Sequence, residues 1–382
     1  MIAIKSDKII LQNGIFEGYV SVNDGKIIAV TAEAPNCDRI YDYTGRYVSP
    51  GFIDLHTHGA GGNGFTDSSP EEVIAGCNVH LAHGTTTILP TVMAAPFSVM
   101  EKSLRDISAA KQSGQVKSNL LGAHLEGPYL SAAQCGAQCP TYITPPIPAE
   151  YEVLIDQYGA DIARWTYAPE NDKGGAFAKY LSAHGILPSA GHTDAKYKDV
   201  SVAIDNGMRL ITHLYSCTST VTRDHGFRSL GVIESAFLRD DLYVEIIADG
   251  KHLPPDLVRM IVKIKGKDRV ALVTDSLDIA ATEAVSGQFK GGSAFIVEDG
   301  VCKLPDRTAF AGSIATADRL IRVMRDECGF DLVDAVYMMT VVPAALMGLH
   351  RGSIVVGADA DIIVFDEEIK VSDVFVGGEK VI

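Results

Sequence analysis

The chain has 382 residues, of which 47% are hydrophobic and 21% are charged, a composition typical of a globular protein with a substantial core. Its 33 basic and 48 acidic residues give a net charge of −15, which excludes a general electrostatic surface for nucleic acid or for an anionic membrane. No stretch approaches the ~20 apolar residues of a membrane span, no signal-peptide pattern opens the sequence, and seven scattered cysteines fit reduced thiols, so we expect a cytoplasmic protein.

The two ends of the chain resemble each other in pattern. Residues 1–50 contain short β-rich pieces joined by turn signals such as Asn23-Asp24-Gly25, and residues 350–382 again contain short strands with Gly and Asp turns. Residues 51–349 instead alternate apolar runs of strand length with helical stretches. We therefore expect both chain ends to pair into one small β domain, a β-sandwich, beside a large domain at 51–349.

Eight apolar runs in the large domain have the length of buried strands. They lie at 51–56, 85–91, 119–127, 163–169, 186–192, 210–214, 243–249 and 270–275. Between the first two runs, Ser68 and Ser69 can cap a helix that begins at Pro70 and ends before Gly84, and residues 256–266 form a second helix by the same logic. Eight near-continuous apolar strands alternating with helices predict an α/β fold, a closed, TIM-like (β/α)₈ barrel.

Polar side chains recur at the C-terminal ends of these strands, which meet at one mouth of a barrel. A single His or Glu at a strand end is more often a hydrogen-bonded structural group. Imidazoles and two carboxylates in one space would be costly to bury without a cation that shares their lone pairs, so the pattern predicts a metal site. In chain order these residues are His56 and His58, Glu126, His192, His213, His252 and Asp275.

The remaining histidines fall on a predicted helix, at helix ends or in loops, and we interpret them as structural or solvent-facing. They are His80, His83, His184, His225 and His350.

The segment PGFIDLHTHG (50–59) resembles the HxH signature of the first barrel strand in the amidohydrolase superfamily. The later blocks HLEGPYL, SAGHTDA, THLYS, IIADGKHL, LVTDS and FAGSIATAD resemble, in order, those of the N-acetylglucosamine-6-phosphate deacetylase family within it. The resemblance covers nearly the whole chain. It implies that Glu126, His192 and His213 bind the metal that activates water.

The same resemblance implies roles for three further residues. Asp275 would be the catalytic acid and base, His252 would polarise the acetyl carbonyl, and Arg223 would pair with the substrate phosphate. In relatives that keep HxH, the pair supports a second metal bridged by the Glu, so we expect one or two divalent ions per chain at His56, His58 and the other ligands. Zinc is our first expectation, with Fe, Mn or Co as alternatives, and the resemblance implies a homodimer.

Three departures from the family pattern leave the substrate open. Gln138 replaces a substrate-contacting His, Ser216-Cys217 replaces Asn-Ala, and Arg223 lies one residue earlier than in the family. We still expect Gln138, Ser216 and Cys217 to contact the substrate, together with His252. The expected substrate is N-acetylglucosamine-6-phosphate, an amino sugar phosphate.

Alternatives to this substrate and activity also stay open. They are N-acetylgalactosamine-6-phosphate, an N-acyl amino acid, a cyclic amide, or a non-catalytic scaffold. A sugar isomerase or aldolase that uses a Schiff base is disfavoured, because none of the eight strand ends carries Lys.

Overall fold

The large domain is a nearly closed barrel of eight parallel strands. In the computed structural model, which describes residues 1–288 and 294–382, neighbouring strands pair in chain order, and the Asp275 amide donates to the His56 carbonyl (2.8 Å) where the last strand meets the first. The predicted (β/α)₈ barrel is therefore confirmed. Its strands are β6 (Phe52–Thr57), β9 (Thr85–Val92), β11 (Ala123–Glu126), β12 (Ile162–Tyr167), β13 (Leu187–Ala190), β14 (Leu210–Ile211), β17 (Tyr243–Ile246) and β18 (Val270–Leu272).

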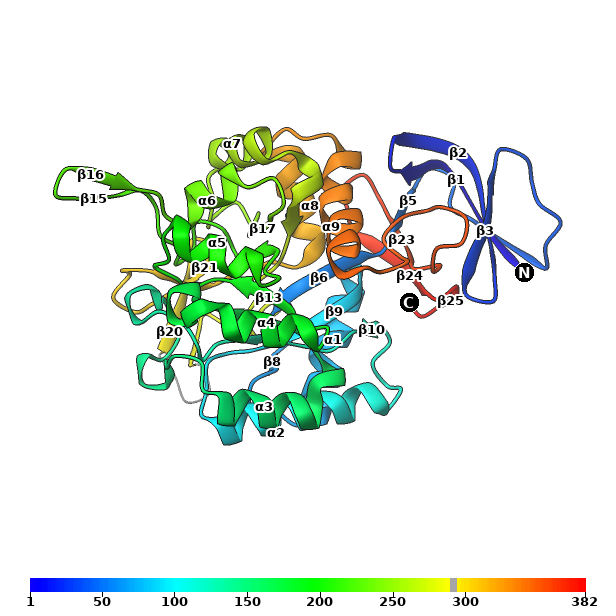
Figure 1. Ribbon diagram of the computed structural model, residues 1–382. Helices are drawn as coiled ribbons and strands as arrows, with labels where there is room; N and C mark the ends of the chain where they lie inside the picture. The colour runs from blue at the N-terminus through cyan, green and yellow to red at the C-terminus, as the bar shows by residue number, and fades with distance from the viewer. Residues whose placement is uncertain (289–293) are drawn as a thin grey trace.

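A helix follows each barrel strand, and these helices surround the barrel (Figure 1). A ninth helix, α9 (Leu332–Met347), contacts β6 and β18 and so covers the seam between the first and last strands. The other helices are α1 (Pro70–Ala82), α2 (Phe97–Gln112), α3 (Pro148–Tyr158), α4 (Ala176–Ala183), α5 (Tyr197–Asp205), α6 (Val232–Leu238), α7 (Pro255–Lys265) and α8 (Ala317–Asp326).

Helix α1 forms where the sequence predicts it. The Ser69 side chain accepts a hydrogen bond from the Glu72 amide (3.3 Å), and the Glu72 carboxylate accepts one from the Ser69 amide (2.7 Å). This capping box satisfies two amides that a helix start otherwise leaves without partners. The helix ends at Ala82, and Gly84 takes a φ of +91°, which favours glycine.

Several predicted strands extend further than the strands that the structure contains. The run 119–127 divides into β10 (Asn119–Leu120) and β11. Gly122 lies in the break, where a Cβ atom would be 2.8 Å from the Asp161 carbonyl oxygen, so a larger residue would not fit there. The run 210–214 ends as a strand at Ile211, and His213 takes a φ of 29°. His192 and Asp275 likewise have positive φ values, 47° and 46°. Three expected site residues thus leave the extended conformation at the end of their strands.

The two chain ends form one eight-stranded sheet beside the barrel, with both termini in it (Figure 1). The predicted pairing of the two ends is confirmed. Strand β1 pairs with β2 on one side and with β4 and β5 on the other, around a core that includes Ile4, Val20 and Phe375. The strands are β1 (Ile2–Leu11), β2 (Gly14–Asn23), β3 (Lys26–Thr31), β4 (Arg39–Asp42), β5 (Tyr47–Pro50), β23 (Ile362–Phe365), β24 (Val371–Val376) and β25 (Glu379–Lys380).

Short strands decorate the loops of the barrel. A hairpin of β15 (Thr222–Asp224) and β16 (Phe227–Ser229) projects away from the body of the molecule (Figure 1). A four-stranded sheet of β19 (Ser286–Gln288), β20 (Ala294–Glu298), β21 (Val301–Lys303) and β22 (Phe310–Gly312) follows β18, and β7 (Gly59–Ala60) pairs with β8 (Asn63–Gly64). Among residues 1–288 and 294–382, no helix has both the length and the apolar character needed to cross a lipid bilayer.

Candidate active site and metal centre

A cavity of about 260 Å³ opens at the C-terminal mouth of the barrel. The side chains that the sequence placed at the strand ends converge there, and all but His56 line the cavity. Phe310 and Gly312 of the inserted sheet form part of the opposite wall. The mouth thus combines a polar floor with an apolar cover, as small-molecule sites commonly do. The polar lining residues are His58, Glu126, Gln138, His192, His213, Ser216, Cys217, His252 and Asp275, with Tyr215 beside them.

Glu126, His192 and His213 form one group that could hold a cation. Glu126 Oε1 lies 3.0 Å from His213 Nε2 and 3.2 Å from His192 Nε2, and the two nitrogens are 3.2 Å apart. Bonds of ~2.0–2.1 Å to one ion, at tetrahedral angles, separate the ligand atoms by ~3.3 Å. The three atoms therefore have the spacing that a single small cation requires.

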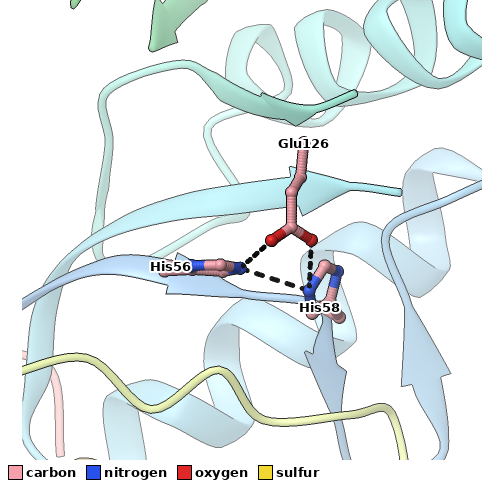
Figure 2. A group of neighbouring side chains, drawn as sticks. All are labelled: His56, His58 and Glu126. Carbon is pink, nitrogen blue, oxygen red and sulfur yellow. Dashed lines mark hydrogen bonds and ion pairs between the residues drawn. The ribbon is translucent and has the colours of Figure 1, made fainter. Parts of the chain in front are cut away.

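His56, His58 and Glu126 form a second such group (Figure 2). The two Nε2 atoms are 3.3 Å apart, His58 Nε2 lies 3.3 Å from Glu126 Oε2, and His56 Nε2 lies 3.5 Å from Glu126 Oε1. Both histidines belong to the segment that ends β6, where residues i and i+2 point to the same side of the strand. Glu126 stands between the two groups and can serve both.

The protonation of the first group supports a role as cation ligands. His192 Nδ1 donates to the Gln134 carbonyl oxygen (2.9 Å), so a neutral His192 ring presents the bare lone pair of Nε2 to Glu126. Two acceptors at 3.2 Å repel each other unless a cation or a proton lies between them. The donor set therefore fits a divalent metal, as its residue types also do.

The carboxylates around His56 favour a positive charge within this cluster of side chains. Burial alone would lower the pKa of His56, but the carboxylates of Asp275 and Glu126 raise it to about 10. Burial alone would likewise raise the pKa of Glu126, and the surrounding histidines hold it well below its usual value. The buried carboxylates thus demand a compensating cation in the cluster.

The carboxylate of Asp275 lies close to both histidines of the second group. Its Oδ1 lies 3.3 Å from His56 Nε2 and 3.2 Å from His58 Nε2. Burial would raise the pKa of Asp275, but the two histidines lower it to about 2, so the side chain is a carboxylate near neutral pH. A carboxylate in this place can accept a proton from a molecule in the cavity.

His252 is oriented by a carboxylate. Its Nδ1 donates to Asp249 Oδ2 (2.9 Å), and the backbone amides of Lys251 and His252 donate to Asp249 Oδ1 (2.9 and 2.8 Å). Because Asp249 accepts the Nδ1 proton, the ring orientation is fixed and Nε2 is the nitrogen left for a molecule in the cavity.

A buried ion pair lies beneath the site, and the sequence analysis did not identify it. Arg164 on β12 and Glu245 on β17 are both 0% exposed and form a bidentate pair. The guanidinium also donates to the Leu55 carbonyl (3.1 Å), to Thr212 Oγ1 (2.8 Å) and to Ser189 Oγ (3.2 Å), so all five of its N–H donors have partners.

This pair supports the strands that carry the metal-site histidines. Leu55 precedes His56 and Thr212 precedes His213, so the guanidinium holds the backbone and side chains next to two candidate ligands. Glu245 Oε2 also lies 3.7 Å from His56 Nδ1, which has no hydrogen-bond partner among the described residues. The signal in the sequence was a charged residue in the middle of each of two apolar strands.

The expected substrate-binding residues have different positions. Ser216 and Cys217 line the cavity, and the loop before Gln138 passes so close that a Cβ on Gly136 would lie 2.5 Å from Cys217 Sγ. Gln138 also lines the cavity, but its amide bonds to Glu126 Oε2 (2.7 Å). Arg223 is exposed on the projecting β15–β16 hairpin and is not among the cavity-lining residues of the described chain.

Of the other histidines, His80 is buried behind β6. Its Nε2 lies 2.9 Å from Thr57 Oγ1 and 3.1 Å from the Gly59 carbonyl oxygen, and burial lowers its pKa to about 4. A neutral ring that contacts Thr57, the residue between His56 and His58, fits the structural role that the sequence suggested.

The chain is similar to known proteins over nearly its whole length. The sequence profile described as the Amidohydrolase family matches residues 47–381. The N-acetylglucosamine-6-phosphate deacetylase of Bacillus subtilis (strain 168) is 31% identical over 377 residues, covering 96% of this chain and 94% of that protein. The N-acetylgalactosamine-6-phosphate deacetylase of Shewanella sp. (strain ANA-3) is 29% identical over 390 residues, covering 99% and 95%.

One solved structure is similar over the full length. It is a variant N-acetyl-D-glucosamine-6-phosphate deacetylase from Mycobacterium smegmatis in complex with N-acetyl-D-glucosamine-6-phosphate. Its TM-score is 0.91 at 29% sequence identity, and the match covers 100% of this chain and 99% of that one. Both the barrel and the sheet of the chain ends are thus shared with that structure.

Proposed function

The chain belongs to the amidohydrolase family, and from that premise we propose that it hydrolyses the acetamide bond of N-acetylglucosamine-6-phosphate. The products are glucosamine-6-phosphate and acetate. The observation that carries the proposal is the convergence of two cation-binding groups, Asp275 and His252 on one cavity. Membership of this family of metal-dependent hydrolases makes the chain an enzyme. The identity of its substrate is our proposal.

The chemistry follows from the positions of these groups. A divalent cation held by Glu126, His192 and His213 supplies Lewis-acid activation of water and of the amide carbonyl. Asp275 accepts the proton of the attacking water, because it is a carboxylate that lines the cavity beside His56 and His58. His252, oriented by Asp249, presents Nε2 to the carbonyl oxygen, where a proton on Nε2 would stabilise the negative charge that develops. Asp275 then returns its proton to the sugar nitrogen, which otherwise leaves poorly.

Several features support a phosphorylated sugar, and the sugar epimer has a second candidate. The relative from Bacillus subtilis and the structure from Mycobacterium smegmatis are both named for N-acetylglucosamine-6-phosphate. The Shewanella relative, of nearly equal similarity, is named for N-acetylgalactosamine-6-phosphate, so that epimer is the second candidate. Ser216 and Cys217 at the cavity supply neutral polar side chains that suit a sugar hydroxyl.

The substrate assignment is tested by acetate release from four compounds. They are N-acetylglucosamine and N-acetylgalactosamine, each with and without a 6-phosphate. The proposal expects the highest kcat/KM for N-acetylglucosamine-6-phosphate and poor turnover without phosphate. A preference for the galacto epimer would support the second candidate. Equal activity on the unphosphorylated sugars would contradict both.

We propose zinc as the metal, because histidine and carboxylate ligands at tetrahedral spacing suit it, although Fe, Mn and Co accept the same ligands. We further propose a homodimer. Its support is the projecting hairpin, where Phe227 is 79% exposed and would be buried by a second copy. Light scattering of the wild type and of Phe227→Ser tests this. A wild-type monomer would contradict it.

We also propose that residues 51–349 form the catalytic domain and that residues 1–50 and 350–382 form the small domain. A cytoplasmic location is proposed because scattered cysteines in odd number suit a reducing compartment. Cell fractionation with detection in the soluble cytoplasmic fraction tests the location.

A further inference from the structure

Gln138 lines the cavity but has its side-chain amide held by the protein. Its side chain is buried, and Oε1 accepts a hydrogen bond from the Ala94 backbone amide (3.0 Å), while Nε2 donates to Glu126 Oε2 (2.7 Å). The Ala94 amide can only donate, so the carbonyl oxygen of Gln138 must face it. The orientation of the side-chain amide is thus fixed, and its N–H₂ group must face Glu126.

The bond to Gln138 acts on the carboxylate that stands between the two cation-binding groups. Glu126 Oε1 faces His192 and His213 and also lies 3.5 Å from His56 Nε2, and Oε2 faces His58 at 3.3 Å. Each carboxylate oxygen has two acceptor directions. Gln138 occupies one direction at Oε2, which fixes the rotation of the carboxylate about its last bond and leaves the other direction toward His58.

We propose that Gln138 is a positioning residue of the metal centre, which holds Glu126 Oε2 toward His58 and so keeps the group of His56, His58 and Glu126 arranged for a second cation. This inference rests on the proposed metal-dependent function. It assigns Gln138 a role different from the substrate contact expected from the sequence. Hydrogen bonds that orient a ligating carboxylate commonly change metal affinity 10–100-fold when they are lost.

The competing role for Gln138 predicts a different result. One Nε2 hydrogen remains beyond the bond to Glu126, and it could contact the substrate, since Gln138 lines the cavity. A substrate contact would change KM and leave cation binding unaltered. A positioning residue changes the affinity for the second cation, and it does so when substrate is absent.

The test compares cation binding by the wild type and Gln138→Met, which keeps the length of the side chain and removes its hydrogen bonds. Metal-free protein is titrated with Zn²⁺ by calorimetry, and bound zinc is counted by elemental analysis. We expect two ions per wild-type chain. In Gln138→Met the weaker dissociation constant should rise at least ~10-fold, the tighter one should change less than ~3-fold, and KM should stay within ~3-fold. The exposed Gln157→Met is the matched control and should bind zinc as the wild type does.

Unaltered zinc binding by Gln138→Met would overturn the inference, and so would a single zinc ion in the wild type. A large rise in KM with normal zinc binding would assign Gln138 to the substrate instead. Melting of the metal-free proteins checks that Gln138→Met is folded, and Gln138→Glu, which keeps an acceptor for Ala94, serves as the second variant. The carboxylate of Gln138→Glu can still accept from Ala94 but cannot donate to Glu126, so the weaker zinc dissociation constant should again differ from that of the wild type, and an unchanged value would contradict the inference. If the wild type binds two zinc ions but releases no acetate, the proposed function fails while this inference stands.

Discussion

The buried pair of Arg164 and Glu245 is the feature beneath the site whose removal we expect to have the largest effect on stability. The perturbation is Glu245→Gln, which keeps the volume of the side chain and removes its charge. In the folded protein, both partners are 0% exposed and the guanidinium bonds both carboxylate oxygens. In the variant, the side-chain NH₂ group of glutamine faces a guanidinium N–H, so one donor loses its acceptor and the charge of Arg164 has no counterion.

The expected magnitude follows from that burial. Removing one partner of a buried ion pair costs about 3–5 kcal/mol, because the remaining charge stays in a medium of low polarity. For a chain of this length we expect Tm to fall by roughly 5–10 °C. The matched control is Glu298→Gln, which removes one partner of a bidentate pair with Arg307 whose side chains are 37% and 58% exposed. Water can solvate Arg307 after that change, so the control should melt close to the wild type.

The assay is thermal and urea unfolding of metal-free protein followed by circular dichroism. Metal-free protein is used so that a change in metal affinity does not enter the measured stability. If Glu245→Gln loses no more stability than Glu298→Gln, the pair does not hold the strands together as we infer from its contacts.

Three further predictions concern single side chains. Asp275→Asn should lower kcat by ~10²–10⁴-fold and leave metal content largely intact, since its proposed work is proton transfer; near-normal turnover of the metal-loaded variant would refute that role. Arg223 lies on the projecting hairpin, outside the cavity of its own chain, so it would reach a bound phosphate through the hairpin contact of the proposed homodimer. In that case Arg223→Ala should raise KM steeply for N-acetylglucosamine-6-phosphate and leave the poor activity on the unphosphorylated sugar unchanged, and a KM equal to that of the wild type would remove Arg223 from phosphate binding. Burial lowers the pKa of Lys265 from 10.5 to about 8, so the unfolded chain binds more protons than the folded one between these values, and stability should rise from pH 8 to 10.5. For Lys265→Met, the free energy of unfolding measured with urea should rise less over this pH range than it does for the wild type. Identical slopes of this free energy against pH for the two proteins would contradict this pKa.

The barrel could be predicted from the sequence because each strand is buried on both sides. The run 270–273 (VALV) is continuously apolar, the run 85–91 (TTTILPT) carries no charge, and the spacing of such runs by helices specifies a parallel sheet. The ends of the strands could not be predicted as well. His192 and His213 take left-handed backbone angles that the composition of the runs does not indicate, and at these residues the conformation serves the position of the side chain.

The site could be predicted in part. The histidines and carboxylates at strand ends were identified because parallel strands bring their C-terminal ends together. Arg164 and Glu245 were missed, because each lies inside an otherwise apolar strand and its partner is 81 residues away. Gln138 was expected at the substrate, because the sequence cannot show that its loop folds back and places the side-chain amide against Glu126.

The central claim is that the residues at the barrel mouth bind a metal that the deacetylation needs. The most direct measurement is acetate release from N-acetylglucosamine-6-phosphate by metal-free protein as Zn²⁺ is added in fractions of an equivalent, with Glu126→Gln/His213→Asn as the matched protein. The account predicts negligible activity without metal, a rise that saturates at one or two equivalents per chain, and no rise in the double variant. Full activity in protein shown by elemental analysis to be free of metal, or equal activity in the double variant, would contradict it.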